Sequence, residues 1–323
     1  MITIAEAVKT EIRRRKQPVI TWFEVERAVR RLYRERQFDG QPLNLRGGAP
    51  TPRMMARIKS VLLDPREFTS RDFIEKYDLR GAVKEDALSS QRYVLMMDLD
   101  FPATVCRVAG VSDAQPEDLC CLVDPWCYVS HLSAMQRWGL TNRNPLALHL
   151  SRPAKPIWRG RAKDEVRDEY WDLEPGQQAP QPRERVTFPA TLRGRALEVF
   201  EPNFFGHSIA IPDSTTRIAT VGQVFRDTVH EPALCGGMSH VLEIWEEHAE
   251  AYLNDIIEAM DALKPSKIAL VRAGYILSER LGIKDPRVEA WTAFAERGGS
   301  RKLDPQRPFE AAHSKRWMLS LNV

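Results

Sequence analysis

Apolar residues recur at helical spacing from the start of the chain, and polar residues mark where helices should begin and end. Ile4, Val8 and Ile12 fall on one side of a helix. Thr3 precedes this helix and is followed three residues later by a glutamate, which is the spacing of a capping box. Pro18 then ends the helix, because proline lacks the backbone N–H that a helix needs. The pattern predicts an amphipathic helix with a basic C-terminal end.

The same signals recur twice in the segment that follows. A second helix is predicted to begin after Thr21 and to run to about Gln37. The stretch Phe38–Pro50 is rich in Gly, Pro and Asn and is predicted to be a loop. Thr51 then caps a third helix, with Pro52 at its first position, where a missing N–H costs nothing. Three helices are therefore predicted in the N-terminal segment.

A β-hairpin is predicted after these helices, because Gly81–Lys84 and Arg92–Met97 flank the polar segment Glu85–Gln91. Three helices followed by a hairpin is the order of a winged helix-turn-helix domain. The turn of such a motif usually has three or four residues, whereas about thirteen separate the second and third helices here. Either this turn carries an insertion, which we favour, or the helix that reads DNA begins at Ser70 and Thr51–Leu63 supports it.

The rest of the chain has a mixed pattern. Helices are predicted over Pro116–Leu122 and Val129–Trp138, and a loop rich in Pro and Arg follows. Short strands are predicted over Val186–Leu192, Ala196–Phe200, His207–Ile211 and Thr216–Val221. Helical spacing returns over Val224–Val229, Met238–Ala251, Asn254–Leu263 and Ile268–Leu281, and Trp317–Val323 has the pattern of a closing strand. We expect an α+β protein, with a winged-helix domain in residues 1–100 and a mixed α+β domain in residues 101–323.

Basic residues are concentrated at the front of the chain. Residues 1–63 hold fourteen Lys and Arg residues against six Asp and Glu residues, whereas the whole chain of 323 residues has a net charge of only +3. The remainder of the chain is therefore acidic. A basic segment attracts polyanions, so we expect double-stranded DNA to bind the N-terminal part.

Membrane and export signals are not found in the sequence. No stretch approaches the roughly 20 apolar residues that a membrane helix needs. The N-terminus has neither the short basic start nor the apolar block of a secretory signal. We expect a cytoplasmic protein that does not bind or span a membrane.

The third predicted helix is the main candidate for reading DNA. Its positions Ile58 and Leu62 should face the core, which leaves Arg53 and Arg57 on the opposite side with Lys59 beside them. An exposed charged face on an ordinary helix is the alternative interpretation. The other candidates are basic residues expected to contact phosphates, namely Arg13, Arg14, Arg15, Lys16, Arg27, Arg30, Arg31, Lys84, Arg92, Arg301 and Lys302.

Three short segments carry residue types that catalysis or metal binding uses. Ser130–Ser133 holds two serines and a histidine, but a catalytic triad is recognised by geometry that adjacency does not supply, so we expect a buried helix start. Asp98–Asp100 places two carboxylates on one face of a strand, where they could hold Mg²⁺, but the Gly-Ser turn that precedes such a pair in nucleotidyltransferases is missing, so we expect a polar strand end. Gly236–Gly237 indicates a tight turn into a helix rather than a phosphate site.

The cysteines show neither a disulfide framework nor zinc spacing. Their number is odd and no C-x-x-C pair is present, so we expect buried apolar residues at Cys106, Cys120, Cys121, Cys127 and Cys235. We predict no catalytic residue, no metal site and no cofactor, and therefore no enzymatic activity.

Several ordered segments resemble one protein family. The segments are Tyr128–Ala134 with Trp138–Thr141, Pro232–Gly237, Arg272–Leu277 with Leu281 and Gly282, Gly298–Pro305 and Trp317–Val323. Together they are similar to the AbiEi antitoxin family. The chain departs from the family pattern at Gln223–Asp227, where the family commonly has an R-T-L-L-D-like run. This chain keeps the aspartate, as Asp227, but its arginine stands directly before the aspartate, at position 226.

The resemblance implies an antitoxin that represses transcription of its own operon. It implies an N-terminal winged helix on inverted repeats in the promoter, a C-terminal antitoxin domain, and a nucleotidyltransferase toxin as partner, neutralised without a tight complex. One alternative is a winged-helix transcription factor that has no toxin partner. Another is a DNA-processing enzyme, which would need a carboxylate cluster with a lysine.

Overall fold

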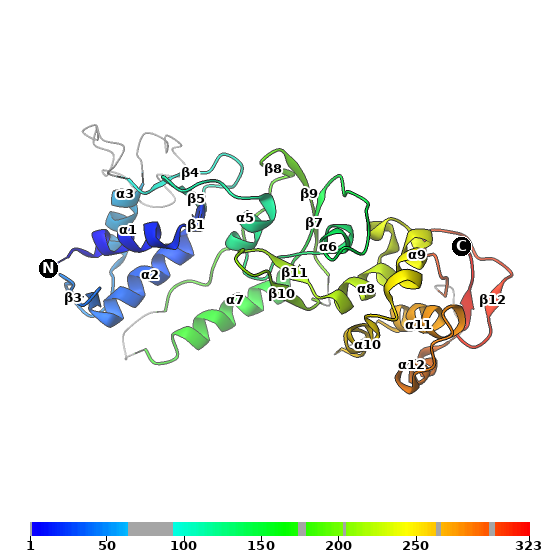
Figure 1. Ribbon diagram of the computed structural model, residues 1–323. Helices are drawn as coiled ribbons and strands as arrows, with labels where there is room; N and C mark the ends of the chain where they lie inside the picture. The colour runs from blue at the N-terminus through cyan, green and yellow to red at the C-terminus, as the bar shows by residue number, and fades with distance from the viewer. Residues whose placement is uncertain (1, 64–92, 174–178, 203–204, 263–265, 297–300) are drawn as a thin grey trace. The chain divides into compact units, whose positions relative to one another are not determined.

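The structure is a computed structural model of the 323-residue chain (Figure 1). It describes residues 2–63, 93–173, 179–202, 205–262, 266–296 and 301–323. Contacts divide the chain into two compact units, of which unit 1 is residues 1–126 and 155–194 and unit 2 is residues 127–154 and 195–323. Both units mix helices and strands, so the predicted α+β class is confirmed. Neither unit is one continuous segment, and the predicted domain boundary after residue 100 stays a prediction.

Unit 1 begins with three capped helices. They are α1 (Ile4–Arg15), α2 (Trp22–Glu35) and α3 (Pro52–Leu62). The side chains of Thr3, Thr21 and Thr51 each accept a hydrogen bond from the backbone N–H three residues later, at 3.3, 3.4 and 3.2 Å. Local sequence signals therefore placed these helices correctly, because each cap satisfies a donor that the helix itself leaves unpaired. The unit also holds α5 (Pro116–Val123) and α7 (Lys155–Glu169).

A three-stranded antiparallel sheet packs against these helices. Its strands are β1 (Val19–Thr21), β5 (Val105–Val108) and β4 (Leu95–Met97), in that order across the sheet. Of the hairpin predicted from sequence, the second strand forms as β4, and it pairs with the later strand β5. The other predicted strand, Gly81–Lys84, and the alternative helix at Ser70 lie outside the described residues. The predicted loop also contains a two-residue ladder between β2 (Gln37–Phe38) and β3 (Gln41–Pro42).

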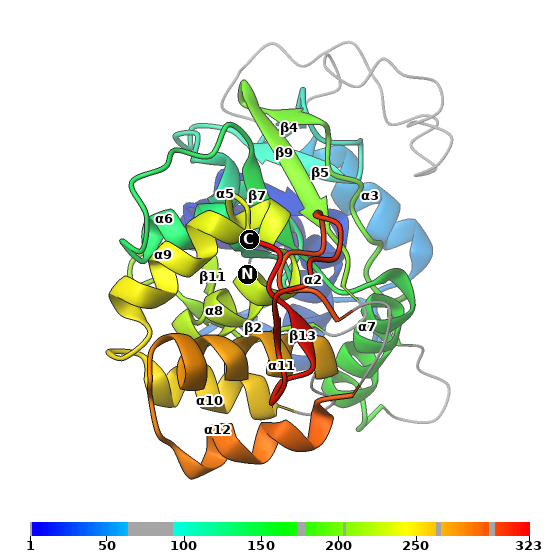
Figure 2. The same cartoon turned by 90° about the vertical axis from the view of Figure 1, so that its right-hand side faces the viewer.

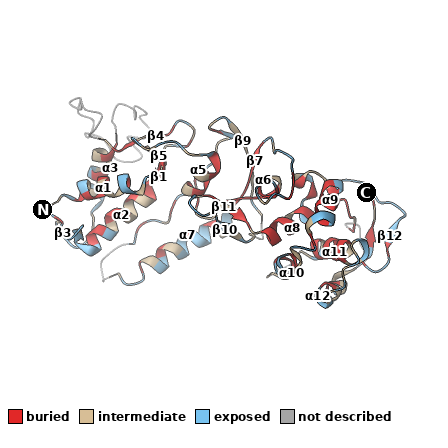
Figure 3. Cartoon of the chain, viewed as in Figure 1, coloured by how far each residue is buried: buried red, intermediate tan, exposed pale blue. Residues whose placement is uncertain are grey.

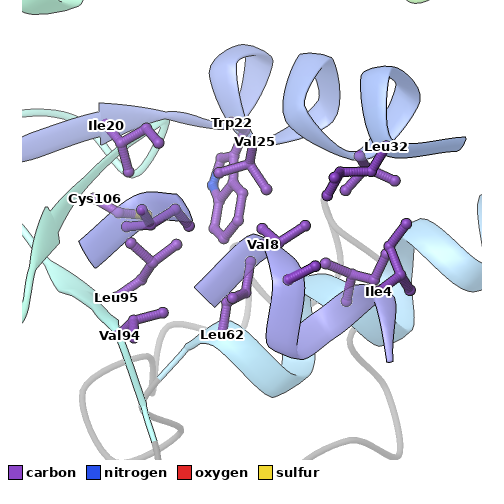
Figure 4. Packing of buried hydrophobic residues seen from close by; sticks show 14 of the residues in the cluster. Ile4, Val8, Ile20, Trp22, Val25, Leu32, Leu62, Val94, Leu95 and Cys106 are labelled. Carbon is purple, nitrogen blue, oxygen red and sulfur yellow. The ribbon is translucent and has the colours of Figure 1, made fainter. Parts of the chain in front are cut away.

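One apolar core joins the three helices to the sheet (Figure 4). Each element contributes a fully buried side chain, with Val8 from α1, Val25 from α2, Leu62 from α3, Leu95 from β4 and Cys106 from β5. All five cysteines are buried, which confirms their interpretation as small apolar residues. This core fixes the three helices and the sheet as one body.

Helix α7 and strand β7 (Leu148–Ser151) lie in the stretch that the sequence pattern indicates as a loop, so that prediction is wrong. Only Trp158, Ala162 and Val166 of α7 are buried, and charged residues fill most of its other positions. Such a narrow apolar stripe gives a weak periodic signal. Strand β7 alternates apolar and polar residues, as Leu-His-Leu-Ser, but it has only four residues, which gives a short periodic signal.

Unit 2 is built on a mixed sheet. Its strands are β6 (Tyr128–Val129), β7, β9 (Arg195–Phe200), β10 (Ser208–Ala210) and β11 (Arg217–Ala219), in the order β10-β11-β6-β7-β9. The pairs β11–β6 and β7–β9 are parallel, and the other two pairs are antiparallel. The predicted strands are confirmed near residue 196 with one more residue at its start, and near residues 207 and 216 with shorter bounds. Of the strand predicted at Val186–Leu192, only β8 (Thr191–Leu192) forms.

The helices of unit 2 gather around α8 (Val221–His230), which is buried along most of its length (Figures 2 and 3). They are α6 (His131–Arg137), α9 (Met238–His248), α10 (Leu253–Asp261) and α11 (Lys267–Tyr275). Helix α12 (Pro286–Ala290) instead contacts the helical turn Ile276–Arg280 that follows α11. Gly222 allows α10 to approach closely, because a Cβ there would lie 2.0 Å from the backbone oxygen of Asp255. In the described ranges, no helix is both long enough and apolar enough to cross a bilayer.

The C-terminal part of unit 2 closes against α11. A single π-helical turn, Ile276–Arg280, follows α11, and the hairpin of β12 (His313–Ser314) and β13 (Leu319–Ser320) lies near the end of the chain. The closing strand predicted in Trp317–Val323 is confirmed, although it is only two residues long.

Candidate nucleic-acid interface

Helix α3 presents a basic face to solvent. Ile58 and Leu62 are buried in the core of unit 1, at 1% and 0% exposure, as predicted. Arg53 and Arg57, one helical turn apart, are exposed on the other side. Neither guanidinium forms an ion pair with a carboxylate in the described part of the chain. Two uncompensated cations therefore stand on one exposed helix face.

The C-terminal end of α3 is tied to the sheet. The backbone N–H of Val94 donates to the carbonyl oxygen of Leu62 at 3.1 Å, and Leu63 forms a bridge with Leu95 of β4. Thr51 caps the opposite end of the helix. Because both ends are fixed, the guanidinium groups of α3 are carried on a rigid support.

Lys59 lies beside this face but has contacts of its own. Its Nζ lies 5.2 Å from the centroid of the Trp22 ring, which is within the range of a cation–π interaction. The side chain is half-buried. Lys59 therefore adds positive charge to α3 with less reach than the exposed arginines.

The basic end of α1 has four residues, Arg13, Arg14, Arg15 and Lys16. Arg14 binds Asp39 through Nη1 at 2.7 Å, and this hydrogen bond lowers the pKa of the Asp39 carboxyl. Arg15 binds Glu11 one turn earlier on α1 at 2.5 Å. Arg13 and Lys16 are exposed, and no ion pair joins Lys16 to a described carboxylate. Lys16 is thus the second place where an uncompensated cation reaches solvent.

Carboxylates of α2 and its neighbour α7 neutralise part of the predicted basic face of α2. The Nε of Arg27 lies 2.8 Å from a carboxylate oxygen of Glu169. Arg183 is buried beside the same helices, where it binds Glu24 at 3.1 Å and Glu165 at 2.7 Å. Burial lowers the pKa of Arg183, but the hydrogen bonds and charges of its two partners outweigh burial and raise it overall. This side of α2 is therefore an internal contact of unit 1.

The two remaining candidates on α2 also have acidic partners. Arg30 binds Glu26 at 2.8 Å, and Arg31 binds Glu35 at 2.9 Å and also Glu11 of α1. An arginine already paired with a carboxylate contributes less charge to a phosphate. DNA contact by Arg27, Arg30 and Arg31 stays a prediction, and the geometry favours α3 over α2.

Sequence reasoning missed two basic residues, Arg36 at the end of the second predicted helix and Arg46 in the predicted loop. Arg46 is exposed in a glycine-rich turn, with no ion pair to any described carboxylate. Arg36 is also exposed, and its Nη1 donates to the carbonyl oxygen of Gly47 at 3.4 Å. The signal was an arginine immediately before two glycines, Gly47 and Gly48, where the backbone can approach a phosphate closely.

Arg301 and Lys302 of unit 2 are held by their own surroundings. Arg301 is buried at 9% exposure, and its guanidinium lies 3.5 Å from Glu296. The Nζ of Lys302 donates to two backbone carbonyl oxygens, at 2.7 and 3.0 Å, and lies over the Phe309 ring. Both side chains therefore have structural roles. The two other candidates, Lys84 and Arg92, lie outside the described residues.

Asp98 and Asp100 bind an arginine. Asp98 follows β4, and its Oδ1 accepts from the backbone N–H groups of Asp100 and Phe101 at 3.0 and 3.1 Å. Arg193 donates to both carboxylates at 2.6 Å. Burial opposes ionisation of Asp98, but Arg193 and the two backbone donors outweigh it and lower the pKa of Asp98. The interpretation as a polar strand end is confirmed, and no metal-binding group of three His, Cys, Asp or Glu residues occurs among the described residues.

The other two chemistry-bearing segments lie in unit 2. Ser130, His131 and Ser133 are buried at the start of α6, as predicted. Gly236 and Gly237 both have φ of 90° and form the turn into α9, which confirms the tight-turn interpretation. These conformations favour glycine strongly over residues with a Cβ.

No known family model matches the chain, and no curated protein sequence is significantly similar to it. A proposal about function therefore depends on the topology and exposed charges of unit 1, together with the short resemblances in the sequence.

Proposed function

We propose that unit 1 is a winged helix-turn-helix DNA-binding domain and that the protein is a cytosolic AbiEi-like antitoxin that represses its own operon, without enzymatic activity. The observation that carries this proposal is the topology of unit 1. Among the described residues its elements include α1, β1, α2, α3, β4 and β5 in this order, with the short β2–β3 ladder between α2 and α3, and β1 pairs with β5 rather than with β4. A winged helix has this element order and this strand order.

Helix α3 occupies the position of the recognition helix in that arrangement. Its exposed Arg53 and Arg57 are one turn apart and have no described acidic partner. Arginine can bind a guanine through two hydrogen bonds, to O6 and N7 in the major groove. Lys16 and Arg46 are assigned to phosphates, which position a protein on DNA without reading sequence. The connection between β4 and β5, residues 98–104, contains no Lys or Arg, so we assign it no phosphate contact.

The proposed mechanism is stoichiometric. Two copies occupy an inverted repeat in the promoter, and neutralised phosphates supply most of the affinity. Transcription of a neighbouring toxin gene then falls. The antitoxin role itself rests on the sequence resemblance. A nucleotidyltransferase gene next to the gene for this protein would favour an antitoxin over a transcription factor without a toxin partner. Co-expression should restore growth of cells that express that neighbouring gene.

DNA binding by substituted proteins tests the proposal. We expect full-length protein to retard its own upstream DNA in a gel-shift assay, and Arg53→Ala or Arg57→Ala to weaken binding by about 1 to 3 kcal/mol. Arg159→Ala is the matched control, because Arg159 is exposed on α7 of the same unit and has no described acidic partner. Equal affinity for all three variants would contradict the role of α3.

A further inference from the structure

Unit 2 contains a cavity of about 670 Å³ between its sheet and α8. The sheet side is formed by Tyr128 of β6, Ser151 of β7 and Phe200 of β9, and the helix side includes Gln223 and Asp227. All lining residues belong to unit 2. The volume is within the range of about 300 to 1,000 Å³ that small-molecule sites occupy.

Two residues of α8 that line this cavity, Gln223 and Asp227, each have a buried acceptor atom without a described donor. Gln223 is 5% exposed, and its Nε2 donates to the Oδ1 of Asp227 at 2.7 Å. The Oε1 of Gln223 and the Oδ2 of Asp227 are inaccessible to solvent, and no described group donates to either. A buried acceptor without a partner is unfavourable. The two acceptors, one helical turn apart, are therefore matched to an occupant that carries at least two N–H or O–H donors.

The charge of the lining favours a cation. Three carboxyl groups line the cavity, those of Glu201, Asp227 and Glu231, against one guanidinium, that of Arg226, which donates to a backbone carbonyl of α10. Arg152 lies 3.7 Å from Glu201, so the uncompensated negative charge gathers at the α8 side. These carboxylates would attract a bound cation more strongly than they would in bulk water, because water is partly excluded from the cavity.

The lining histidines add no positive charge. Burial lowers the pKa of His131 to about 3, and the charge of His149 adds to this effect. Burial likewise lowers the pKa of His230, although Glu231 opposes the shift. Both imidazoles are therefore neutral in neutral solution, and their rings are aromatic surfaces rather than cations.

Three lining residues with rings, Tyr128, His131 and Phe200, lie opposite α8. The His131 and Phe200 rings lie 4.6 Å apart between centroids with their planes tilted by 54°, and Tyr128 lies on β6, which β7 separates from β9. Aromatic faces attract cations, and planar cations also stack on them. The wall thus suits a flat positive group better than a neutral aliphatic one.

His131 is held in a strained backbone conformation at this wall. Its φ is 48°, in the left-handed region that residues with a Cβ rarely adopt. The Nδ1 of His131 lies 2.8 Å from the Oγ of Ser130, which in turn accepts from the Oγ of Ser151 at 2.8 Å. A strained residue held by a buried hydrogen-bond network is often part of a binding site.

We propose that this cavity binds a planar nitrogen cation, a guanidinium or amidinium group, which donates to Gln223 Oε1 and Asp227 Oδ2 and stacks against the aromatic wall. The cation belongs either to a free small molecule or to an arginine side chain in a peptide. The guanidinium fork presents parallel donors that match two acceptors at once, which a compact ammonium group does less well. The site does not depend on DNA binding by unit 1.

Calorimetric titration of full-length protein with matched probes tests the proposal. We expect N-acetyl-argininamide to bind about tenfold or more tightly than its neutral isostere N-acetyl-citrullinamide, and more tightly than N-acetyl-lysinamide. Methylguanidine and the peptide Gly-Arg-Gly then distinguish a free small molecule from an arginine side chain in a peptide. A site for a free small molecule should bind methylguanidine, whereas a site for a peptide should bind Gly-Arg-Gly more tightly than methylguanidine. Equal affinity for the arginine and citrulline probes, or no binding of any guanidine probe at millimolar concentration, overturns the proposal.

Substitutions on α8 locate the site. Asp227→Asn and Gln223→Met should each weaken binding of the arginine probe by about tenfold. Glu258→Gln is the control, because Glu258 is an exposed carboxylate on α10 that the cavity does not include. Thermal unfolding without ligand shows whether each variant is folded. Wild-type affinity in a folded Asp227→Asn variant contradicts the assignment.

The pH dependence of binding gives a second readout that a purely structural role would not change. Burial raises the pKa of Asp227 to about 7, and the charge of Glu231 adds to this effect. The hydrogen bond from Gln223 and the charge of Arg226 act in the opposite direction and lower this pKa. Tyr128 and Cys235, which also face this carboxyl, stay protonated because burial raises the pKa of each. Affinity for the arginine probe should therefore rise as pH increases through about 7. The Asp227→Asn variant should lose this rise, and a rise that persists in the variant contradicts the proposal.

Discussion

Asp227 is a carboxyl group that folding places in an unfavourable environment. It occupies a buried face of α8, where Gln223 is its hydrogen-bond donor and one of its oxygens has no donor in the described part of the chain. Burial raises its pKa from 3.8 to about 7, so the unfolded chain releases this proton at lower pH than the folded protein does. Stability therefore falls as pH rises between these two values.

Replacing Asp227 by asparagine should remove this cost. Asparagine carries no charge, yet its amide keeps an oxygen that can accept from Gln223 and has nearly the same volume as the carboxyl group. We expect Asp227→Asn to stabilise unit 2 increasingly from about pH 4 to pH 7, reaching on the order of 3 kcal/mol at pH 8. Urea unfolding at pH 4.5 and pH 8 measures the gain, and a variant that is equally destabilised at both values would contradict it.

At the scale of single elements, α11 is held in place by the contacts of Arg272 and Gly274, which lie in the segment Arg272–Leu277. Arg272 is buried and donates to the carbonyl oxygens of Val229 and Lys302, at 2.7 and 2.9 Å. Burial lowers the pKa of Arg272 to about 10. The Trp317 ring lies directly over Gly274, and its Nε1 donates to Ser278 in the π-helical turn at 3.0 Å. The segment therefore joins α8, α11 and the C-terminus.

Substitution of Gly274 tests this docking. An added Cβ would lie 2.2 Å from the Trp317 ring, so the indole must move. We expect Gly274→Ala to destabilise unit 2 by about 1 to 3 kcal/mol, measured by thermal unfolding. Gly160→Ala on α7 is the control, because no atom lies within 4 Å of an added Cβ there and alanine favours a helix. Unchanged stability in Gly274→Ala would show that Trp317 does not dock tightly.

The sequence predicted elements well where the signals are local. The threonine caps of α1, α2 and α3 each act within three residues, so the sequence alone placed these helices. It missed α7 because three buried residues among fifteen, with charged residues at most other positions, give little periodicity. It also missed the cavity of unit 2, because Tyr128, Ser151 and Gln223 come from separate elements that only the fold brings together.

The same limit applies to the basic residues. Counting charges found the excess in residues 1–63 but could not show which arginines have acidic partners, since Arg27 pairs with Glu169, far along the chain. The exposed groups on α3 were identified correctly because they depend only on helical spacing.

At the scale of the whole molecule, the two units interleave along the chain. Strand β5, at Val105–Val108, is the central strand of the first sheet, and α7 of unit 1 follows a segment of unit 2. A fragment that ends at residue 100 would lack β5, so DNA binding must be measured on the full chain.

The salt dependence of DNA binding tests the central claim most directly. Full-length protein should bind its own upstream DNA with an affinity whose logarithm falls linearly with the logarithm of salt concentration, because binding releases counterions from phosphates. Lys16→Ala and Arg46→Ala together should reduce the slope by about two. An affinity that does not change with salt, or no binding in dilute buffer, would contradict the account.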